Sequence, residues 1–191
     1  MVDLFSDIIQ RCRQGDRTAQ EAVYNLLAGK MYAVCLRYCS NYEEAKDLLH
    51  DGFVTIFTKI DQFKSSGSFE GWARKIFVNH AIELYRKKTK FTTVDCLDQL
   101  TDIEDDNVNH EEESGCNLTE ADLLAMIDEL PNQYKVVFNM YVVDGLSHKD
   151  IAQKLGISEG TSRSNLLRAR GIMQKKVKSK IYFDVVSNAS K

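Results

Sequence analysis

Residues 145–178 have the sequence GLSHKDIAQKLGISEGTSRSNLLRARGIMQKKVK, and this stretch decides the fold that we expect. Ser147 can cap a first short helix, and Gly156 can end it because glycine adopts the left-handed conformation at low cost. Ser158 can cap a second helix. Small and apolar residues then recur along one face at three- and four-residue spacing, namely Ser162, Leu166, Ala169 and Met173. The stretch predicts two short amphipathic helices joined by a tight turn.

The face opposite that apolar stripe is polar and mainly cationic. It carries Glu159, Arg163, Ser164, Leu167 and Arg168. Residues 163–180 contain seven Lys or Arg and no Asp or Glu. A helix-turn-helix whose second helix has one buried face and one cationic face is suited to the major groove of DNA. A surface helical hairpin with a solvated basic edge is the alternative that this stretch leaves open.

The composition of the 191-residue chain favours an all-α protein built from two small domains. Its hydrophobic fraction of 43% and charged fraction of 28% are typical of globular proteins. A single proline and ten glycines are few turn-forming residues, too few for a fold with many strands and tight turns. The chain opens on no cationic-then-apolar signal and contains no run of roughly 18 apolar residues, so we expect a cytoplasmic protein without membrane insertion.

The net charge of −3 conceals three regions of different charge. Residues 1–90 carry 14 Lys or Arg against 11 Asp or Glu. Residues 91–122 carry 11 Asp or Glu and no Lys or Arg. Residues 123–191 carry 11 Lys or Arg against 6 Asp or Glu. Two basic bodies therefore flank an acidic middle, and the modest overall charge does not exclude a polyanionic partner.

The five cysteines do not indicate a disulfide framework, because they are odd in number and lack close pair spacing. Reduced thiols in the cytoplasm are the expectation. Cys35 and Cys39 lie one helical turn apart and could form half of a metal site, but no matching pair supplies the second half. Buried thiols are the better interpretation, and we expect neither a metal nor a cofactor.

Helical spacing of apolar residues predicts five helices in the first 90 residues. Their approximate ranges are 3–14, 18–27, 30–39, 42–61 and 69–90. On the second, the expected inner residues are Ala19, Ala22, Val23 and Leu26. The helix over 42–61 has the widest apolar stripe. Its other face carries Glu44, Asp47, His50, Asp51 and Thr55, and solvation alone would be sufficient to explain that face.

The helix over 69–90 differs because aromatic and cationic residues alternate along it. It follows a small polar loop over residues 64–68, and residues 71–90 contain six Lys or Arg against one Glu. Aromatic residues interleaved with cations beside a polar loop suit unstacked bases and backbone phosphates. A buried Trp72 with solvated lysines around it is the alternative.

Residues 91–119 are acidic and lack helical periodicity, which predicts an extended or disordered linker. A second domain is expected from residue 120 to 180, starting with a helix capped by Thr119 that runs to Leu130. Its expected apolar side consists of Leu123, Leu124, Met126, Ile127 and Leu130. A further helix is expected over 132–143, before the opening motif. Residues 181–191 form a tail whose structure the sequence leaves open.

Taken in order, these blocks resemble the extracytoplasmic-function class of bacterial RNA polymerase sigma factors. The resemblance is carried by RCRQGDRTAQEAVYNLL, AKDLLHDGFVTIFTKIDQF, GSFEGWARKIFVNHAIELYRKK, IDELPNQYKVVFNMYVVDGLSHKDIA and GISEGTSRSNLLRAR. It implies region 2 over residues 1–90, which binds core polymerase and melts the −10 element. It also implies region 4 over residues 120–180, which recognises the −35 element.

The resemblance assigns candidate site residues. The candidates for binding the clamp helices of the largest polymerase subunit are Asp47, His50 and Asp51. The candidates for the −10 element are Phe63, Ser65, Ser66, Phe69, Trp72, Arg74, Lys75, Asn79, Arg86 and Lys87. Among these, Phe63, the loop backbone and Asn79 are the candidates for a pocket that receives a flipped base. The candidates for the −35 element are Glu159, Thr161, Arg163, Ser164 and Arg168.

The implied partners are core RNA polymerase, through its clamp helices and flap region, promoter DNA, and an anti-sigma factor or another regulatory protein. The acidic linker is implied to thread through the basic active-site cleft and RNA-exit channel. Ser162 stands at a usually aliphatic position and Asn165 at a commonly basic one, so their effect on −35 specificity is left open.

Two alternatives compete with this interpretation. A LuxR-type helix-turn-helix transcriptional regulator resembles residues 130–175 almost as well, but it would need a sensory or receiver domain in the first 90 residues. An enzyme is disfavoured because no Gly-rich phosphate loop, metal-ligand pair or nucleophile motif is found in the sequence.

Overall fold

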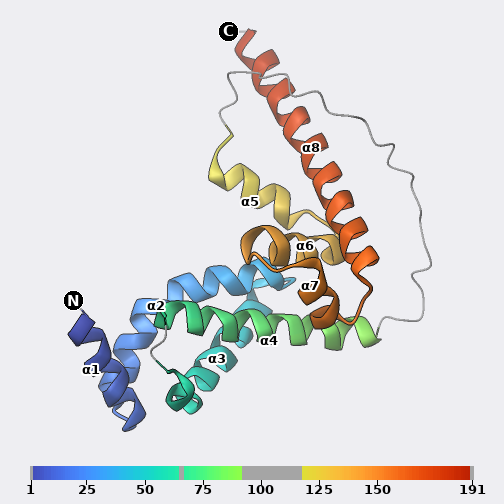
Figure 1. Cartoon of the computed structure of the whole chain (residues 1–191). Helices are drawn as coiled ribbons and strands as arrows, with labels where there is room; N and C mark the ends of the chain where they lie inside the picture. Colours follow the sequence, from blue (N-terminus) through green and yellow to red (C-terminus); the bar gives the residue numbers. More distant parts are fainter. Residues whose placement is uncertain (1, 65–66, 92–117, 190–191) are drawn as a thin grey trace. The chain divides into compact units, whose positions relative to one another are not determined.

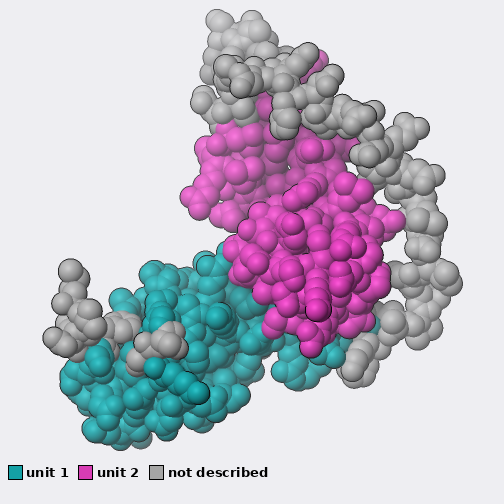
Figure 2. All heavy atoms as spheres, viewed as in Figure 1, with its two compact units in different colours: residues 1–93 teal, residues 94–191 magenta. Residues whose placement is uncertain are grey.

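The computed structural model describes residues 2–64, 67–91 and 118–189, and every regular element within these ranges is helical. The chain divides into two compact units, residues 1–93 and 94–191 (Figures 1 and 2). None of the described helices is long and apolar enough to cross a membrane. The prediction of an all-α protein with two helical domains is confirmed.

The first unit contains α1 (Val2–Arg13), α2 (Arg17–Tyr38), α3 (Tyr42–Thr58), the 3-10 turn η1 (Ile60–Gln62) and α4 (Phe69–Phe91) (Figure 1). Side chains in the connections cap these helices. The Asp16 carboxylate accepts from the backbone N–H of Thr18 at 2.8 Å, and Asn41 Oδ1 accepts from Glu44 N at 2.9 Å. Each cap satisfies amides that the first helical turn leaves unpaired.

The core of the first unit lies where α2, α3 and α4 pack against one another. Its fully buried side chains come from all three helices, and they include Val23, Leu27, Met31, Ile56 and Phe77. Two neighbouring short helices were predicted for residues 18–39, but α2 is continuous. Gly29 costs an interior helix about 0.5–1 kcal/mol relative to alanine. Burial of Leu27 and Met31 on either side of it outweighs that cost.

Continuity of α2 also decides which residues face inward. Val23, Leu27 and Met31 follow one another at four-residue spacing and are each 1% exposed. The expected inner position of Leu26 is wrong, because this side chain is 55% exposed. Ala22 is likewise exposed.

The second unit contains α5 (Glu120–Asp128), α6 (Asn132–Phe138), the π-helical turn η2 (Asn139–Val143), α7 (His148–Leu155) and α8 (Glu159–Ala189). Thr119 and Asp122 form a reciprocal capping box at the start of α5, as the sequence predicted for Thr119. The helix-turn-helix caps are also confirmed. Ser147 accepts from Asp150 N at 3.1 Å, and Gly156 ends α7 with φ at +71°.

Two details of the second unit differ from the sequence expectations. The helix predicted over 132–143 changes to π geometry after Phe138, because Asp144 N bonds to Asn139 O five residues earlier at 3.0 Å. Met126 and Leu130 are the buried residues of the α5 region, whereas Leu123 and Leu124 are 40% and 46% exposed. For the tail, whose structure the sequence left open, α8 continues as far as Ala189. Residues 92–117 of the predicted linker lie outside the described residues.

Candidate nucleic-acid interface

An aromatic cluster lies at the start of α4, and two of its members, Phe63 and Trp72, line a cleft. The ring centroids of Phe63 and Phe69 lie 5.2 Å apart, and both rings lie within 5.6 Å of the Trp72 ring. Phe63 and Phe69 are buried, and Trp72 is half-buried. The cleft has a volume of about 450 Å³, and its lining consists of Gln62, Phe63, Lys64, Gly67, Ser68, Gly71, Trp72 and Lys75. It is called the −10 cleft below because the resemblance names Phe63, Trp72 and Lys75 as candidates for the −10 element.

The −10 cleft contains some of the residues that sequence analysis selected and lacks others. It contains Phe63, Trp72 and Lys75. Asn79 is exposed on α4 but does not line the cleft. Ser65 and Ser66 lie outside the described residues. The cleft also contains Gln62, Lys64, Gly67, Ser68 and Gly71, which were not predicted individually. Lys64, Gly67 and Ser68 belong to the polar loop between Phe63 and Phe69, and that loop is a signal visible in the sequence, whereas Gln62 and Gly71 lie outside it.

The cleft is chemically suited to an unpaired base. Two lysine ammonium groups, of Lys64 and Lys75, can contact phosphates. The half-buried Trp72 offers an aromatic surface, and stacking of a base on an aromatic side chain is tolerant of base identity. Ser68 Oγ accepts a hydrogen bond from Gly71 N at 3.0 Å and so caps α4 at the cleft.

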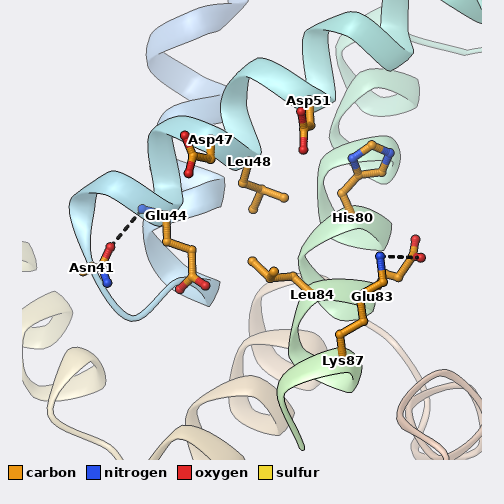
Figure 3. A pocket seen from close by; sticks show the side chains of 9 residues that line it. All are labelled: Asn41, Glu44, Asp47, Leu48, Asp51, His80, Glu83, Leu84 and Lys87. Carbon is orange, nitrogen blue, oxygen red and sulfur yellow. Dashed lines mark hydrogen bonds and ion pairs between the residues drawn. The ribbon is translucent and has the colours of Figure 1, made fainter. Parts of the chain in front are cut away.

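A second cleft separates α3 from the C-terminal half of α4 (Figure 3). Its volume is about 500 Å³, and it is called the α3–α4 cleft below; its lining consists of Asn41, Glu44, Asp47, Leu48, Asp51, His80, Glu83, Leu84 and Lys87. Asp47 and Asp51, which sequence analysis assigned to polymerase binding, both line it. His50 is exposed on α3 but outside this lining. Lys87, assigned from the sequence to the −10 element, lies in this cleft and not in the −10 cleft.

The charges of the α3–α4 cleft are only partly balanced. Glu44 pairs with Lys88, and Lys87 Nζ lies 3.3 Å from Glu83 Oε1. Within the described residues, Asp47 and Asp51 are not engaged in an ion pair and remain exposed. Both side chains lie on α3 among the residues that line the cleft (Figure 3). The two aspartates therefore give this surface an uncompensated negative charge.

The helix-turn-helix contains a polar pair in its interior. Ser162 is fully buried, and its Oγ lies 2.9 Å from Nδ1 of His148 in α7. The His148 ring stacks on the Tyr141 ring with centroids 4.6 Å apart. The Cζ atom of Arg170 lies over the Tyr141 ring, 5.8 Å from its centroid. Ser162 can thus occupy an inward position because its hydroxyl has a partner.

Burial lowers the pKa of His148 below its ordinary value, and the positive charge of Arg163 lowers it further. Arg170 acts in the same direction, whereas Glu159 opposes the shift. The neutral imidazole is therefore the form that this packing favours.

The exposed face of α8 presents most of the predicted −35 residues. Glu159, Thr161 and Arg163 are exposed, and Arg163 Nη2 donates to Glu159 Oε2 at 3.1 Å. Ser164 is half-buried and donates from Oγ to the Thr161 carbonyl at 3.0 Å. Arg168 is also half-buried, beside the Tyr134 hydroxyl at 3.5 Å.

Two further positions of α8 modify the expected surface. Asn165 is only 9% exposed, so this position adds no side chain to the cationic face. Leu167 is 58% exposed and adds an apolar side chain there. No group of three or more His, Cys, Asp or Glu side chains suited to a metal occurs within the described residues.

A helix-turn-helix with an exposed cationic helix, preceded on the same chain by an aromatic cleft bearing lysines, defines a two-unit DNA-binding protein. Comparison with known families specifies it further. Residues 23–91 match Sigma-70 region 2, and residues 120–173 match Sigma-70 region 4. The two matches occur in this order and together span well over half of the chain.

Curated relatives belong to the same group. The chain is 26% identical over 177 residues to the ECF RNA polymerase sigma factor SigW of Bacillus subtilis, covering 89% of this chain and 95% of the relative. It is 26% identical over 159 residues to the ECF RNA polymerase sigma factor SigE of Mycolicibacterium smegmatis, covering 82% of this chain but only 62% of that longer relative.

Solved structures give weaker likenesses. The sigma factor RpoE of Bartonella quintana, solved with the anti-sigma factor NepR, has a TM-score of 0.48 at 20% identity and covers 83% of this chain and 96% of that one. CnrH, solved with the cytosolic domain of CnrY, has a TM-score of 0.47 at 15% identity. The match covers 90% of this chain and 96% of that one.

The chain belongs to the sigma-70 family of RNA polymerase sigma factors, in its extracytoplasmic-function class. It is therefore a promoter-recognising specificity subunit. The LuxR-type alternative is not favoured, because residues 23–91 match region 2 where such a regulator would need a sensory or receiver domain.

Proposed function

We propose that this chain binds core RNA polymerase through α3, opens the −10 element at the −10 cleft and recognises the −35 element through α8. The observation that carries the proposal is the occurrence of region 2 and region 4 on one chain, in the order that promoter binding requires. The geometry of three surfaces supports the assignment of residues.

The exposed face of α3 is the proposed polymerase-binding surface. Asp47 and Asp51 are uncompensated carboxylates beside an open cleft, and His50 lies on the same exposed side of the helix. Such a surface suits a helix that carries Arg or Lys, and Arg pairs especially well with carboxylates. The clamp helices of the largest polymerase subunit are the proposed partner, and the flap region is the proposed partner of the second unit.

The −10 cleft is the proposed site for an unstacked base of the non-template strand. Flipping a base costs a few kcal/mol of unstacking, which stacking on an aromatic side chain can offset. Trp72 is the residue placed to stack, because Phe63 and Phe69 are buried beneath it. Lys64 and Lys75 would hold the adjoining phosphates. Arg74, Asn79 and Arg86 would contact the strand farther along α4.

The exposed face of α8 is the proposed reader of the −35 element. Arg163 is the strongest candidate for a base contact, because its exposed guanidinium can donate two hydrogen bonds to guanine. Glu159, which holds Arg163, and the neighbouring Thr161 would adjust that contact. Ser164 and Arg168 remain proposed DNA-binding residues at the edge of this face.

The remaining expectations follow from this role. The chain itself would perform no catalysis and would act in the cytoplasm, where the polymerase is found. RpoE of Bartonella quintana was solved with an anti-sigma factor. By analogy, we propose a protein inhibitor of that kind for this chain.

Transcription in vitro with purified core polymerase tests the proposal. A library of randomised promoters is transcribed with and without the chain, and the transcript starts are sequenced. We expect a set of starts that depends on the chain and shares two upstream elements. Failure to form a holoenzyme, or the absence of any start that depends on the chain, would overturn the proposal.

A further inference from the structure

Arg13, the last residue of α1, contacts the wall of the −10 cleft from outside residues 23–91, the range of the region 2 match. The region 2 match begins at residue 23, so α1 is not part of it. Arg13 Nη2 nevertheless donates a hydrogen bond of 2.7 Å to the carbonyl oxygen of Phe63, fifty residues later in the chain. This contact joins α1 to the end of η1.

The Phe63 carbonyl is a position where a donor matters. Phe63 follows η1, and its N–H bonds to the Ile60 carbonyl at 3.1 Å. Its ring packs under Trp72 in the −10 cleft. The ring is thus held by aromatic packing and the N–H by η1, while Arg13 holds the carbonyl. Together these three contacts determine the orientation of Phe63.

The guanidinium of Arg13 is committed to this contact. The residue is half-buried, and its Nε is buried without a hydrogen-bond partner among the described residues. A carboxylate oxygen of the exposed Asp61 lies 3.9 Å from Nε, too far for a hydrogen bond. Gln10 Oε1 accepts from Nη1 at 3.4 Å. Desolvating part of a guanidinium is unfavourable, so the bond from Nη2 to Phe63 is the contact that compensates it best.

We propose that Arg13 is a positioning residue for strand opening. It orients Phe63 and so keeps the −10 cleft in the shape that receives an unstacked base. Arg13 does not contact DNA in this proposal, which rests on the proposed function of the −10 cleft.

The test uses the full chain in holoenzyme and a promoter recovered from the library experiment. The variants are Arg13→Met, which removes the donor, and Arg13→Lys, which retains a donor on a shorter reach. Arg11→Met is the matched control, because Arg11 lies on the same helix and pairs with Asp16 at 2.7 Å, away from Phe63. Open complexes are measured by permanganate reactivity of unpaired thymines on duplex DNA and on DNA with a pre-opened −10 bubble.

Arg13→Met is expected to reduce open complexes on duplex DNA about tenfold, the effect of losing one charge-assisted hydrogen bond. It should lose much less on the pre-opened bubble, because the cost of unpairing and unstacking, which capture of the base must offset, is already met there. Arg13→Lys should recover part of the loss, and Arg11→Met should open duplex DNA normally.

Normal opening by Arg13→Met would overturn the inference. An equal loss on both templates would also overturn it, because the defect would then lie in assembly or folding. The proposed function fails separately, and only if the wild-type chain supports transcription from neither template.

Discussion

Gly52 in α3 lies directly against the ring of Phe77 in α4: a Cβ atom added to Gly52 would lie 2.0 Å from Cε1 of that ring. Phe77 is fully buried and also packs edge-on against Phe53, with ring centroids 5.5 Å apart. The missing side chain at Gly52 therefore provides the space that the large ring occupies. This pair sets how closely α3 and α4 approach, and thereby supports the α3–α4 cleft.

Gly52→Ala is expected to destabilise the first unit by about 1–3 kcal/mol, the cost of overpacking a filled core. Gly29→Ala is the matched control. Gly29 also lies inside a helix, but nothing lies within 4 Å of its added Cβ, so alanine should stabilise by about 0.5–1 kcal/mol. Trp72 is the only tryptophan in the chain, so denaturant unfolding followed by its fluorescence reports on the first unit. If both variants shift the free energy of unfolding in the same direction, the close approach of Gly52 to the Phe77 ring is contradicted.

The two uncompensated aspartates of the α3–α4 cleft lead to a second prediction. Asp47→Asn combined with Asp51→Asn should weaken core polymerase binding about tenfold, or about 1.4 kcal/mol. The loss should shrink as salt rises, because salt screens exposed charges. Asp7→Asn combined with Glu21→Gln removes two exposed carboxylates from α1 and α2 and is the control for net charge. Binding is measured by competition for labelled core polymerase. If both pairs of substitutions weaken binding equally, the aspartates of the α3–α4 cleft contribute no more than their net charge.

The pair of His148 and Ser162 predicts a pH dependence of the second unit. The pKa of His148 is lowered in the folded chain, so between that value and about 6.5 the unfolded chain binds more protons than the folded one. Stability of the helix-turn-helix should therefore rise with pH through this window and fall as pH drops below about 6.5.

Proton NMR titration of the histidine ring measures this shift directly. His148→Gln identifies the resonance, and Ser162→Ala removes the hydroxyl partner at a cost of about 1 kcal/mol. A His148 pKa at or above the value in the unfolded chain would show that the imidazole is not held in its neutral form.

Local signals explain why the caps and the helix-turn-helix could be predicted from sequence. Ser147, Gly156 and Ser158 act on amides or carbonyls within four residues of themselves, so their effect is visible in a short window. Burial of Ser162 on the inward stripe was predictable for the same reason. Its partner His148 was not, because the pairing depends on how α7 packs against α8.

Non-local packing accounts for what sequence analysis missed. The break expected between residues 27 and 30 is absent because the apolar residues around it are buried by two other helices, which overrides local propensity. The resemblance assigned Lys87 to the −10 element, and the packing of α4 against α3 places it in the lining of the α3–α4 cleft, where it pairs with Glu83. The π turn after Phe138 depends on one hydrogen bond of altered register, which apolar periodicity does not distinguish from an α-helix.

Cys35 is predicted to be chemically inert in the folded chain. Burial raises the pKa of its thiol to about 12, and the neighbouring Cys39 adds to the shift. Because the thiolate is the reactive form, iodoacetamide at pH 8 should not modify Cys35 until the first unit unfolds. Trypsin separates residues 31–37 from residues 38–46, so mass spectrometry can follow Cys35 apart from Cys39. Rapid labelling of the native chain would contradict its burial, and labelling in denaturant is the control for reagent activity.

The exposed face of α8 predicts two kinds of DNA contact that mutation can separate. Arg163 is proposed to contact a base, so Arg163→Ala should cost about 1–3 kcal/mol and relax preference at one position of the −35 element. Lys175 is exposed three turns later, where contact with phosphate is expected. Lys175→Ala should weaken binding to all sequences equally. It should also reduce by about one the slope of the logarithm of the binding constant against the logarithm of salt concentration.

Binding of holoenzyme to a library of −35 variants at two salt concentrations distinguishes these outcomes. Glu159→Gln adds a third test, because Glu159 now holds the Arg163 guanidinium at 3.1 Å. Releasing that guanidinium should increase binding to unrelated sequences more than binding to the preferred one. If Arg163→Ala instead weakens every sequence alike, Arg163 is a phosphate contact, and base recognition must come from Thr161, Ser164 or the exposed Leu167.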